Sequence, residues 1–141
     1  MTVRLALAAS TLALLAASPS MAMSKGAAYL VKERIAAVCP GGGTFAPKGI
    51  TERDLTGDGR ADLILDLAGL TCRGAANGLN DECGAAHCPV AFYVRKGDVL
   101  VLVSEVASIG ARVGPGNPPR ITLVGFEYQE HSVRWNGRDF E

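Results

Sequence analysis

The spacing of hydrophobic positions changes once along the chain. Over residues 25–39 the apolar positions, Tyr29 and Val38 among them, recur three and four residues apart, which is the spacing of an amphipathic helix. Ser24 precedes this run as a natural N-cap, and the Pro-Gly-Gly-Gly sequence at 40–43 ends it. Beyond that point the pattern alternates, so we expect strands and no second helix.

The clearest strand is expected at residues 61–69. Its leucines alternate with Asp62, Ile64 and Asp66, so that the leucines face one side of the strand and the other three residues face the opposite side. A short strand is expected before it, within residues 44–55, and leads into a turn rich in aspartate.

The second half of the chain predicts hairpins separated by loops. Residues 90–106 indicate two strands joined through Lys96-Gly97-Asp98, whereas residues 70–88 have no period and form a loop. A Gly/Pro loop at 114–119 separates a weak strand from a firm one at 121–126. Near the end, Asn136-Gly137 favours a type I′ turn between strands.

The sum of these elements predicts an α+β fold. One N-terminal helix packs on a mostly antiparallel sheet of about six strands, because hairpin-length connections join consecutive strands. No internal repeat is present, since the aspartate turn occurs once.

The first 22 residues have the order of a secretory signal peptide. Arg4 precedes an apolar run at 5–17, and Ser20-Met21-Ala22 provides a small-x-small cleavage site. The run is shorter than the roughly 20 residues of a membrane-spanning helix. We therefore expect a periplasmic or secreted protein with a single domain at 23–141 and no membrane anchor after cleavage.

Four cysteines follow the signal peptide, an even number that indicates two disulfides in an exported domain. The favoured pairing closes a short loop through Cys83–Cys88 and ties the helix to the strands through Cys39–Cys72. The alternative pairs Cys72 with Cys83 and Cys39 with Cys88. A zinc site of Cys72, Cys83, His87 and Cys88 is less favoured, because the spacing lacks a C-x-x-C pair.

The number and distribution of charged residues argue against two classes of binding partner. The chain has 14 basic and 14 acidic residues, and the basic ones are scattered, so no surface for nucleic acid or anionic lipid is expected.

Residues 54–62 carry the most specific chemical pattern. With Asp54 as position 1, side-chain oxygens follow at positions 3, 5 and 9 from Thr56, Asp58 and Asp62, and the Arg60 carbonyl stands at position 7. Calcium prefers six to eight oxygen ligands and takes them from alternating positions of a glycine-hinged loop. The five residues therefore predict a structural calcium site.

The pattern departs from an EF-hand in two respects. Position 12 is Leu65 instead of glutamate, and Thr56 stands where Asp or Asn is usual. The alternative is an unliganded turn, in which Asp54 and Asp58 accept hydrogen bonds from backbone amides.

Residues 54–67 resemble the Asp-x-Asx-x-Asp-Gly-x-x-Asp turn of FG-GAP and VCBS-type repeats in integrin-like propellers. The resemblance implies a bend between two strands that calcium stabilises, and a single copy does not build a propeller. With the "CGAAHC" sequence at 83–88 and "RWNGRDF" at 134–140, the chain also resembles small, uncharacterised periplasmic proteins of Gram-negative bacteria. That second resemblance implies compartment and architecture only.

A binding surface is predicted at the proline-restricted loop of Gly114, Pro115, Asn117 and Pro118, because a restricted loop loses little entropy on docking and we expect this one to project beyond the sheet. We expect a monomeric, non-enzymatic envelope domain that binds a protein or a glycan. The alternative is a small envelope hydrolase or an inhibitor of one. A hydrolase would gather His87 or His131 with a carboxylate or a nucleophile in one pocket, for example Cys88 with His131, whereas a binding domain would keep both histidines peripheral.

Overall fold

The computed structural model describes residues 22–141. The expected signal peptide therefore lies outside the described residues, except for Ala22. No helix in the part that is described is long and apolar enough to cross a bilayer. The elements follow one another in this order: α1 (Lys25–Val38), β1 (Gly43–Phe45), the 3-10 helix η1 (Pro47–Gly49), β2 (Ile50–Arg53), β3 (Asp62–Asp66), η2 (Leu67–Gly69), β4 (Leu70–Cys72), β5 (Cys88–Lys96), β6 (Val99–Ser108), β7 (Ala111–Gly116), β8 (Pro119–Val124), η3 (Phe126–Tyr128) and β9 (Glu130–Val133).

The helix has the predicted bounds. The Ser24 side chain accepts a hydrogen bond from the Ala27 N–H at 3.2 Å, as an N-cap does. Ala27 and Val38 are buried against the sheet, whereas Tyr29, which is among the apolar positions of the predicted helix, is 61% exposed. The buried stripe runs through positions 27, 31, 35 and 38, and Tyr29 lies to one side of it.

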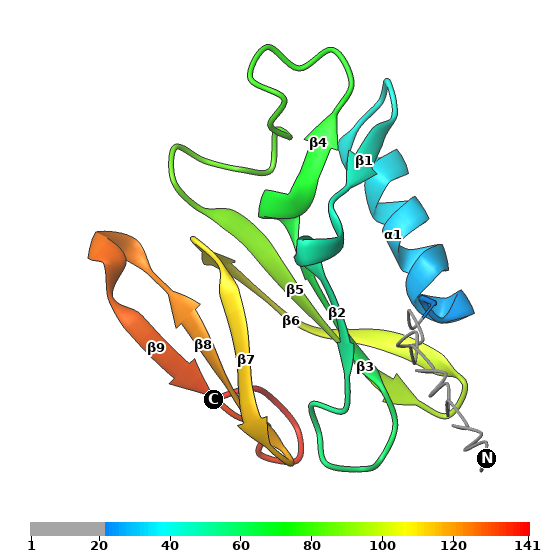
Figure 1. Cartoon of the computed structure of the whole chain (residues 1–141), viewed down its shortest axis with the longest axis vertical. Helices are drawn as coiled ribbons and strands as arrows, with labels where there is room; N and C mark the ends of the chain where they lie inside the picture. Colours follow the sequence, from blue (N-terminus) through cyan, green and yellow to red (C-terminus); the bar gives the residue numbers. More distant parts are fainter. Residues whose placement is uncertain (1–21) are drawn as a thin grey trace, which may run out of the picture.

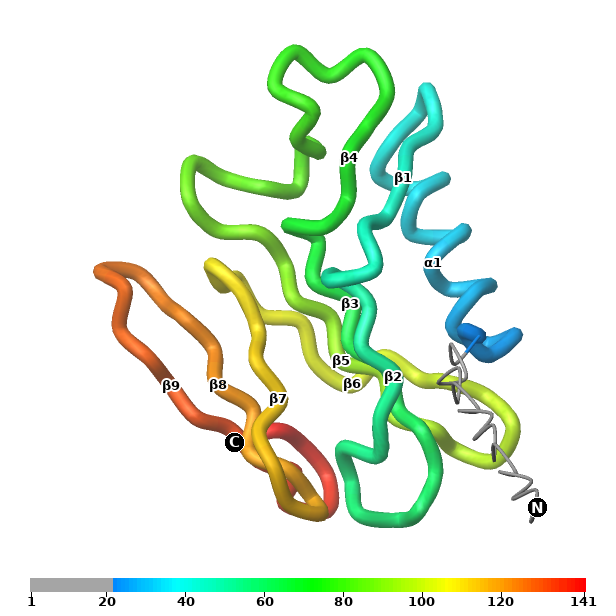
Figure 2. Tube along the Cα trace, in the orientation of Figure 1, coloured from blue at the N-terminus to red at the C-terminus, as the bar shows by residue number. Residues whose placement is uncertain are grey.

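The central sheet has four antiparallel strands in the order β2-β3-β5-β6. The predicted alternation of β3 is confirmed: its leucines belong to one hydrophobic cluster and Ile64 to another. Both faces of β3 are covered, because the sheet lies between two layers. In Figure 1 and Figure 2, α1 lies on one side of the sheet and the β7-β8-β9 sheet lies on the other.

The expectation of one sheet with about six strands is wrong, since the described residues form nine strands in three sheets. The apolar second face of β3 and β5 requires a cover, which Ile121 and Leu123 of β8 provide. The chain leaves the central sheet after β6, where the Ser108 hydroxyl donates to the Gly110 carbonyl at 2.7 Å and accepts from the Val124 N–H at 3.0 Å. This bond network directs β7 into a separate sheet.

The turns agree with the sequence in part. The β5–β6 hairpin turns at Gly97 and Asp98, as predicted. The Asn136-Gly137 pair lies within a longer turn, because Trp135 pairs with Phe140 and the Asn136 N–H donates to the Asp139 carbonyl at 3.0 Å. The predicted type I′ turn is therefore wrong, although the chain does reverse there.

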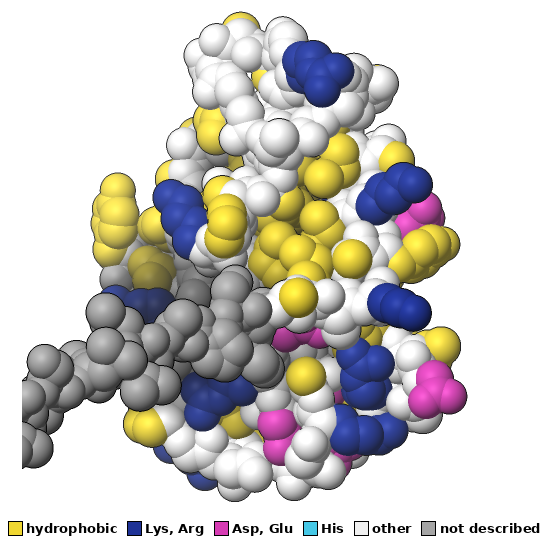
Figure 3. Space-filling model, turned by 45° about the vertical axis from the view of Figure 1, so that its right-hand side comes forward, with side chains coloured by type: hydrophobic (Ala, Val, Ile, Leu, Met, Phe, Trp, Pro, Cys, Tyr) yellow, Lys and Arg dark blue, Asp and Glu magenta, His cyan; other side chains and the backbone are white. Residues whose placement is uncertain are grey.

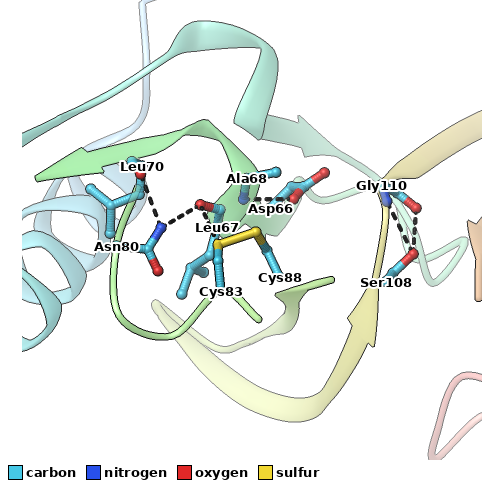
Figure 4. The surroundings of a disulfide bond; sticks show 9 residues. All are labelled: Asp66, Leu67, Ala68, Leu70, Asn80, Cys83, Cys88, Ser108 and Gly110. Carbon is cyan, nitrogen blue, oxygen red and sulfur yellow. Dashed lines mark hydrogen bonds between the residues drawn. A yellow bond between two sulfur atoms is a disulfide. The ribbon is translucent and has the colours of Figure 1, made fainter. Parts of the chain in front are cut away.

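The two disulfides have the favoured pairing, Cys39–Cys72 and Cys83–Cys88. The first joins the end of α1 to β4, and the second closes the loop that precedes β5. Figure 4 shows the second bridge beside the buried Asn80, whose side-chain amide donates to the Leu67 and Leu70 carbonyls at 2.8 and 2.9 Å. The loop is thus fixed at both ends.

Candidate functional site

The aspartate turn joins β2 to β3 and is held by hydrogen bonds within the turn. The Asp54 carboxylate accepts from four backbone N–H groups, three of them on Oδ1 and one, from Gly59, on Oδ2 at 2.8 Å. A carboxylate has about four acceptor positions, so this one is fully used. The turn therefore forms around the Asp54 side chain.

Asp62 anchors the same turn from below. Its side chain is completely buried, and Oδ2 accepts from the Leu55 and Thr56 N–H groups at 2.8 and 3.1 Å. Its Oδ1 accepts from the Arg95 N–H on β5 at 2.8 Å. A buried carboxylate is stable when charge-assisted bonds replace its water, and these three bonds do so.

Asp58 stands at the exposed edge of the turn. It accepts from the Arg60 backbone N–H at 2.9 Å and from the Arg60 guanidinium at 3.0 Å. The backbone bond first, and then the guanidinium, lower the pKa of the Asp58 carboxyl. Arg60 in turn donates to the Gly97 carbonyl of the β5–β6 turn at 3.0 Å, which joins the two turns.

The five predicted calcium ligands thus lie in one turn. Its three carboxylates bond to donors of the protein, with the Thr56 N–H shared by Asp54 and Asp62, whereas the buried Thr56 Oγ1 has no hydrogen-bond partner among the described residues. Within residues 22–141, no three His, Cys, Asp or Glu side chains converge as ligands for one ion. The bonds that satisfy the three carboxylates are those of the unliganded alternative. Calcium binding at this turn remains a prediction.

The predicted binding loop lies beside the aspartate turn at the same end of the molecule (Figure 1). The Arg53 guanidinium donates to the Gly114 and Gly116 carbonyls at 2.7 and 3.1 Å. Gly57 has φ +85°, and a Cβ there would lie 3.1 Å from Pro118 Cδ. The expectation that this loop projects beyond the sheet is wrong: Gly114 and Pro115 belong to β7, and Asn117-Pro118 form a tight turn against the aspartate turn. Its binding role remains a prediction.

A different surface appears at the other end of the β7-β8-β9 sheet, where η3 connects β8 to β9 (Figure 1). Phe126 and Tyr128 are 71% and 78% exposed. Glu127 and Tyr128 have φ of 60° and 59°, a left-handed conformation that costs a side-chain-bearing residue about 1–2 kcal/mol. Strain of this kind concentrates at functional sites.

The Phe126 ring is supported by a histidine from another part of the chain. The His87 and Phe126 ring centroids are 3.9 Å apart, and the planes are tilted by 35°. His87 precedes Cys88 in the disulfide-closed loop, and its carbonyl accepts from the Gly84 N–H at 2.8 Å. We call His87, Phe126, Glu127 and Tyr128 the aromatic tip.

Sequence reasoning missed the aromatic tip. The strand predicted at 121–126 includes Phe126, and in an alternating strand an aromatic residue has about an even chance of facing inward. The strand ends at Val124, and alternation does not apply to the turn that follows, in which Glu127 and Tyr128 are left-handed. The run of polar residues at 129–132 was the available signal, because it places Phe126 and Tyr128 at a hairpin end with little apolar sequence to cover them.

The described residues do not form the zinc site or a catalytic site built on a cysteine or histidine. All four cysteines are in disulfides, so the zinc site and a Cys88 nucleophile are wrong. His131 is exposed on β9, with its ring against the backbone of Gly125. Neither histidine lines the pocket beside Glu52 or the pocket beside the Cys39–Cys72 bridge.

Comparison of the chain with known protein families, with curated proteins and with solved structures finds no match. The functional argument therefore depends on the geometry of the described residues.

Proposed function

We propose that the protein is a non-enzymatic, exported binding domain of the bacterial envelope that docks on a partner protein through its aromatic tip. The observation that carries this proposal is the exposure of Phe126 and Tyr128 at the end of a hairpin. Aromatic side chains are enriched in protein interfaces and provide much of their binding energy. Burying one such side chain contributes about 1.5–3 kcal/mol.

The tip is also prepared for binding before a partner arrives. Glu127 and Tyr128 are fixed in one backbone conformation, and the Gly125 N–H donates to the Gln129 carbonyl at 2.8 Å across the turn. The Cys83–Cys88 bridge and the buried Asn80 hold the loop that carries His87. A surface that is already ordered loses less entropy on docking.

The alternative function, a small envelope hydrolase, finds less support. Catalysis by His87 would require a hydrogen-bonded nucleophile or carboxylate next to the ring, but His87 Nε2 is buried and has no hydrogen-bond partner among the described residues. His87 instead stacks on Phe126, a contact suited to holding an aromatic surface. An inhibitor of a hydrolase would be one form of the proposed protein-binding domain.

Site-specific photo-crosslinking tests the proposal. The photoreactive amino acid p-benzoylphenylalanine would replace Phe126 or Tyr128 in the chain exported by a Gram-negative host, and Tyr29 would serve as the matched control. Tyr29 is also an exposed tyrosine, but it lies on α1, on the far side of the central sheet. We expect one protein to be joined to positions 126 and 128 and not to position 29.

Two outcomes would contradict the proposal. Equal adducts at all three positions would mean that the tip has no preferred partner, as would no adduct at 126 and 128. Co-sedimentation with peptidoglycan that is lost in the Phe126→Ala/Tyr128→Ala variant would assign the tip to a glycan instead of a protein.

A further inference from the structure

Glu52 on β2 uses one carboxylate oxygen and leaves the other without a partner. Its Oε2 accepts from the Ser24 N–H at 2.8 Å, directly before α1. Its Oε1 is buried and has no hydrogen-bond partner among the described residues. A buried carboxylate oxygen without a hydrogen-bond donor is energetically unfavourable. A ligand that donates a hydrogen bond to Oε1 would remove this cost.

The same carboxylate lines a pocket of about 510 Å³. Glu52 is the one ionisable residue among the eight that line it, and Ser24 is the one other polar residue. The remaining six are apolar: Ala22, Met23, Phe45, Pro47, Ile50 and Ala61. Figure 3 shows hydrophobic side chains gathered in the middle of this face. The pocket therefore suits a positive group attached to an apolar chain.

The chain itself provides such a group where the expected signal peptide ends. Hydrolysis of the Ala22–Met23 peptide bond consumes one water, leaves a carboxylate on Ala22 and frees the α-amino group of Met23. Ala22 and Met23 are both exposed, so a peptidase can reach the bond. An α-amino group has an ordinary pKa of about 7.7–8.0 and is mostly protonated at neutral pH.

We propose that Glu52 is the binding site for the Met23 α-ammonium that signal-peptide cleavage creates. The Ser24 N–H is already fixed on Oε2, and the Cα atoms of Met23 and Ser24 are about 3.8 Å apart. The new ammonium therefore forms next to the carboxylate, and any of its three donors can bond to Oε1. The Met23 side chain keeps its place in the apolar pocket.

The surrounding charges favour this ion pair after cleavage. A cation at Met23 faces the positive end of the α1 dipole, and no acidic residue stands in the first turn of α1. Of the cations nearby, Lys25 begins α1, Lys48 faces Asp66, and Arg95 donates to the Ala61 carbonyl at 2.8 Å. The Glu52 carboxylate offsets this positive charge. Signal-peptide cleavage therefore adds a stabilising ion pair between Met23 and Glu52, which the precursor lacks.

The test compares one protein before and after cleavage. In the full chain, residues 19–22 are replaced by the factor Xa recognition sequence, so that the protease leaves Met23 as the first residue. We expect cleavage to raise the melting temperature by about 3–6 °C, and acetylation of the new α-amine to reverse the rise. In Glu52→Gln, whose amide oxygen still accepts from Ser24, neither step should change the melting temperature. Glu33→Gln, an exposed site on α1, should behave as the parent does.

An equal response to cleavage and acetylation in the parent and in Glu52→Gln would overturn the proposal. If Glu52→Gln does not fold, an NMR titration of the parent decides. The ¹³C-dimethylated Met23 α-amine should titrate with a pKa above that of the same amine in the urea-unfolded chain. An equal pKa in the folded and unfolded chains would also overturn the proposal.

Discussion

At the scale of the residue, backbone amides explain how this chain tolerates carboxylates at one bend. Asp54 and Asp62 accept seven hydrogen bonds from backbone N–H groups, and Asp58 pairs with Arg60. The sequence predicted that these residues gather in a turn. It did not reveal their partners, because an aspartate followed by glycines serves a metal loop and an amide-capped turn equally well.

The calcium proposal makes a prediction that separates these two roles. If the turn binds calcium, millimolar calcium should raise the melting temperature relative to chelator, and Asp58→Asn should abolish the rise. The concentration follows from the 10⁻⁴–10⁻³ M affinity of extracellular calcium modules. Thermal melts in calcium, magnesium and chelator measure the effect. Identical melting temperatures in calcium, magnesium and chelator would contradict calcium binding at this turn.

Asp66 makes the stability of the fold depend on pH. Burial raises the pKa of this carboxyl, so the folded state binds its proton more tightly than the unfolded chain does. Stability from this group is therefore present at low pH and is lost as pH rises through the folded-state pKa. Asp66→Asn keeps an acceptor for the Ala68 N–H, which Asp66 Oδ1 now bonds at 3.0 Å.

We therefore expect Asp66→Asn to gain stability relative to the parent between acid and neutral pH. Urea unfolding at several pH values measures the difference. A constant difference across that range, or a gain by the parent on going to neutral pH, would contradict the burial of this carboxylate.

At the scale of the element, the sequence predicted the helices, strands and turns that depend on residues close together in the chain. The bounds of α1, the alternation of β3 and the β5–β6 hairpin follow from periodicity and turn residues. The three-sheet arrangement does not, because it depends on which strands meet across the core. Ile64 and Ile121 are 57 positions apart in sequence and share one cluster, a contact that no local pattern encodes.

The two disulfides should differ in their contribution to stability. Cys39–Cys72 closes a separation of 33 residues and Cys83–Cys88 one of 5, which corresponds to about 4 and about 2 kcal/mol in the chain-entropy treatment. We expect Cys39→Ala/Cys72→Ala to lower the free energy of unfolding more than Cys83→Ala/Cys88→Ala does. Chemical denaturation measures both, and the reverse order would show that the short loop stabilises the fold by other means.

At the scale of the whole molecule, the fold separates two surfaces. The aspartate turn and the β7–β8 turn meet at one end, where charged side chains bond to backbone groups. The aromatic tip lies at the far end of the β8–β9 hairpin, where two aromatic rings remain exposed. Sequence reasoning located the first end and missed the second, because His87 and Phe126 meet only after the three layers have assembled.

The measurement that tests the central claim is the affinity of the purified partner, identified by crosslinking at the tip, for the parent and three variants. We predict that Phe126→Ala/Tyr128→Ala weakens binding at least about 30-fold, the loss expected for about 2 kcal/mol. Tyr29→Ala should leave the affinity unchanged. Glu127→Gly, which keeps both rings but frees the backbone, should weaken binding and stabilise the fold. Equal affinity of the parent and the double-alanine variant would contradict the account.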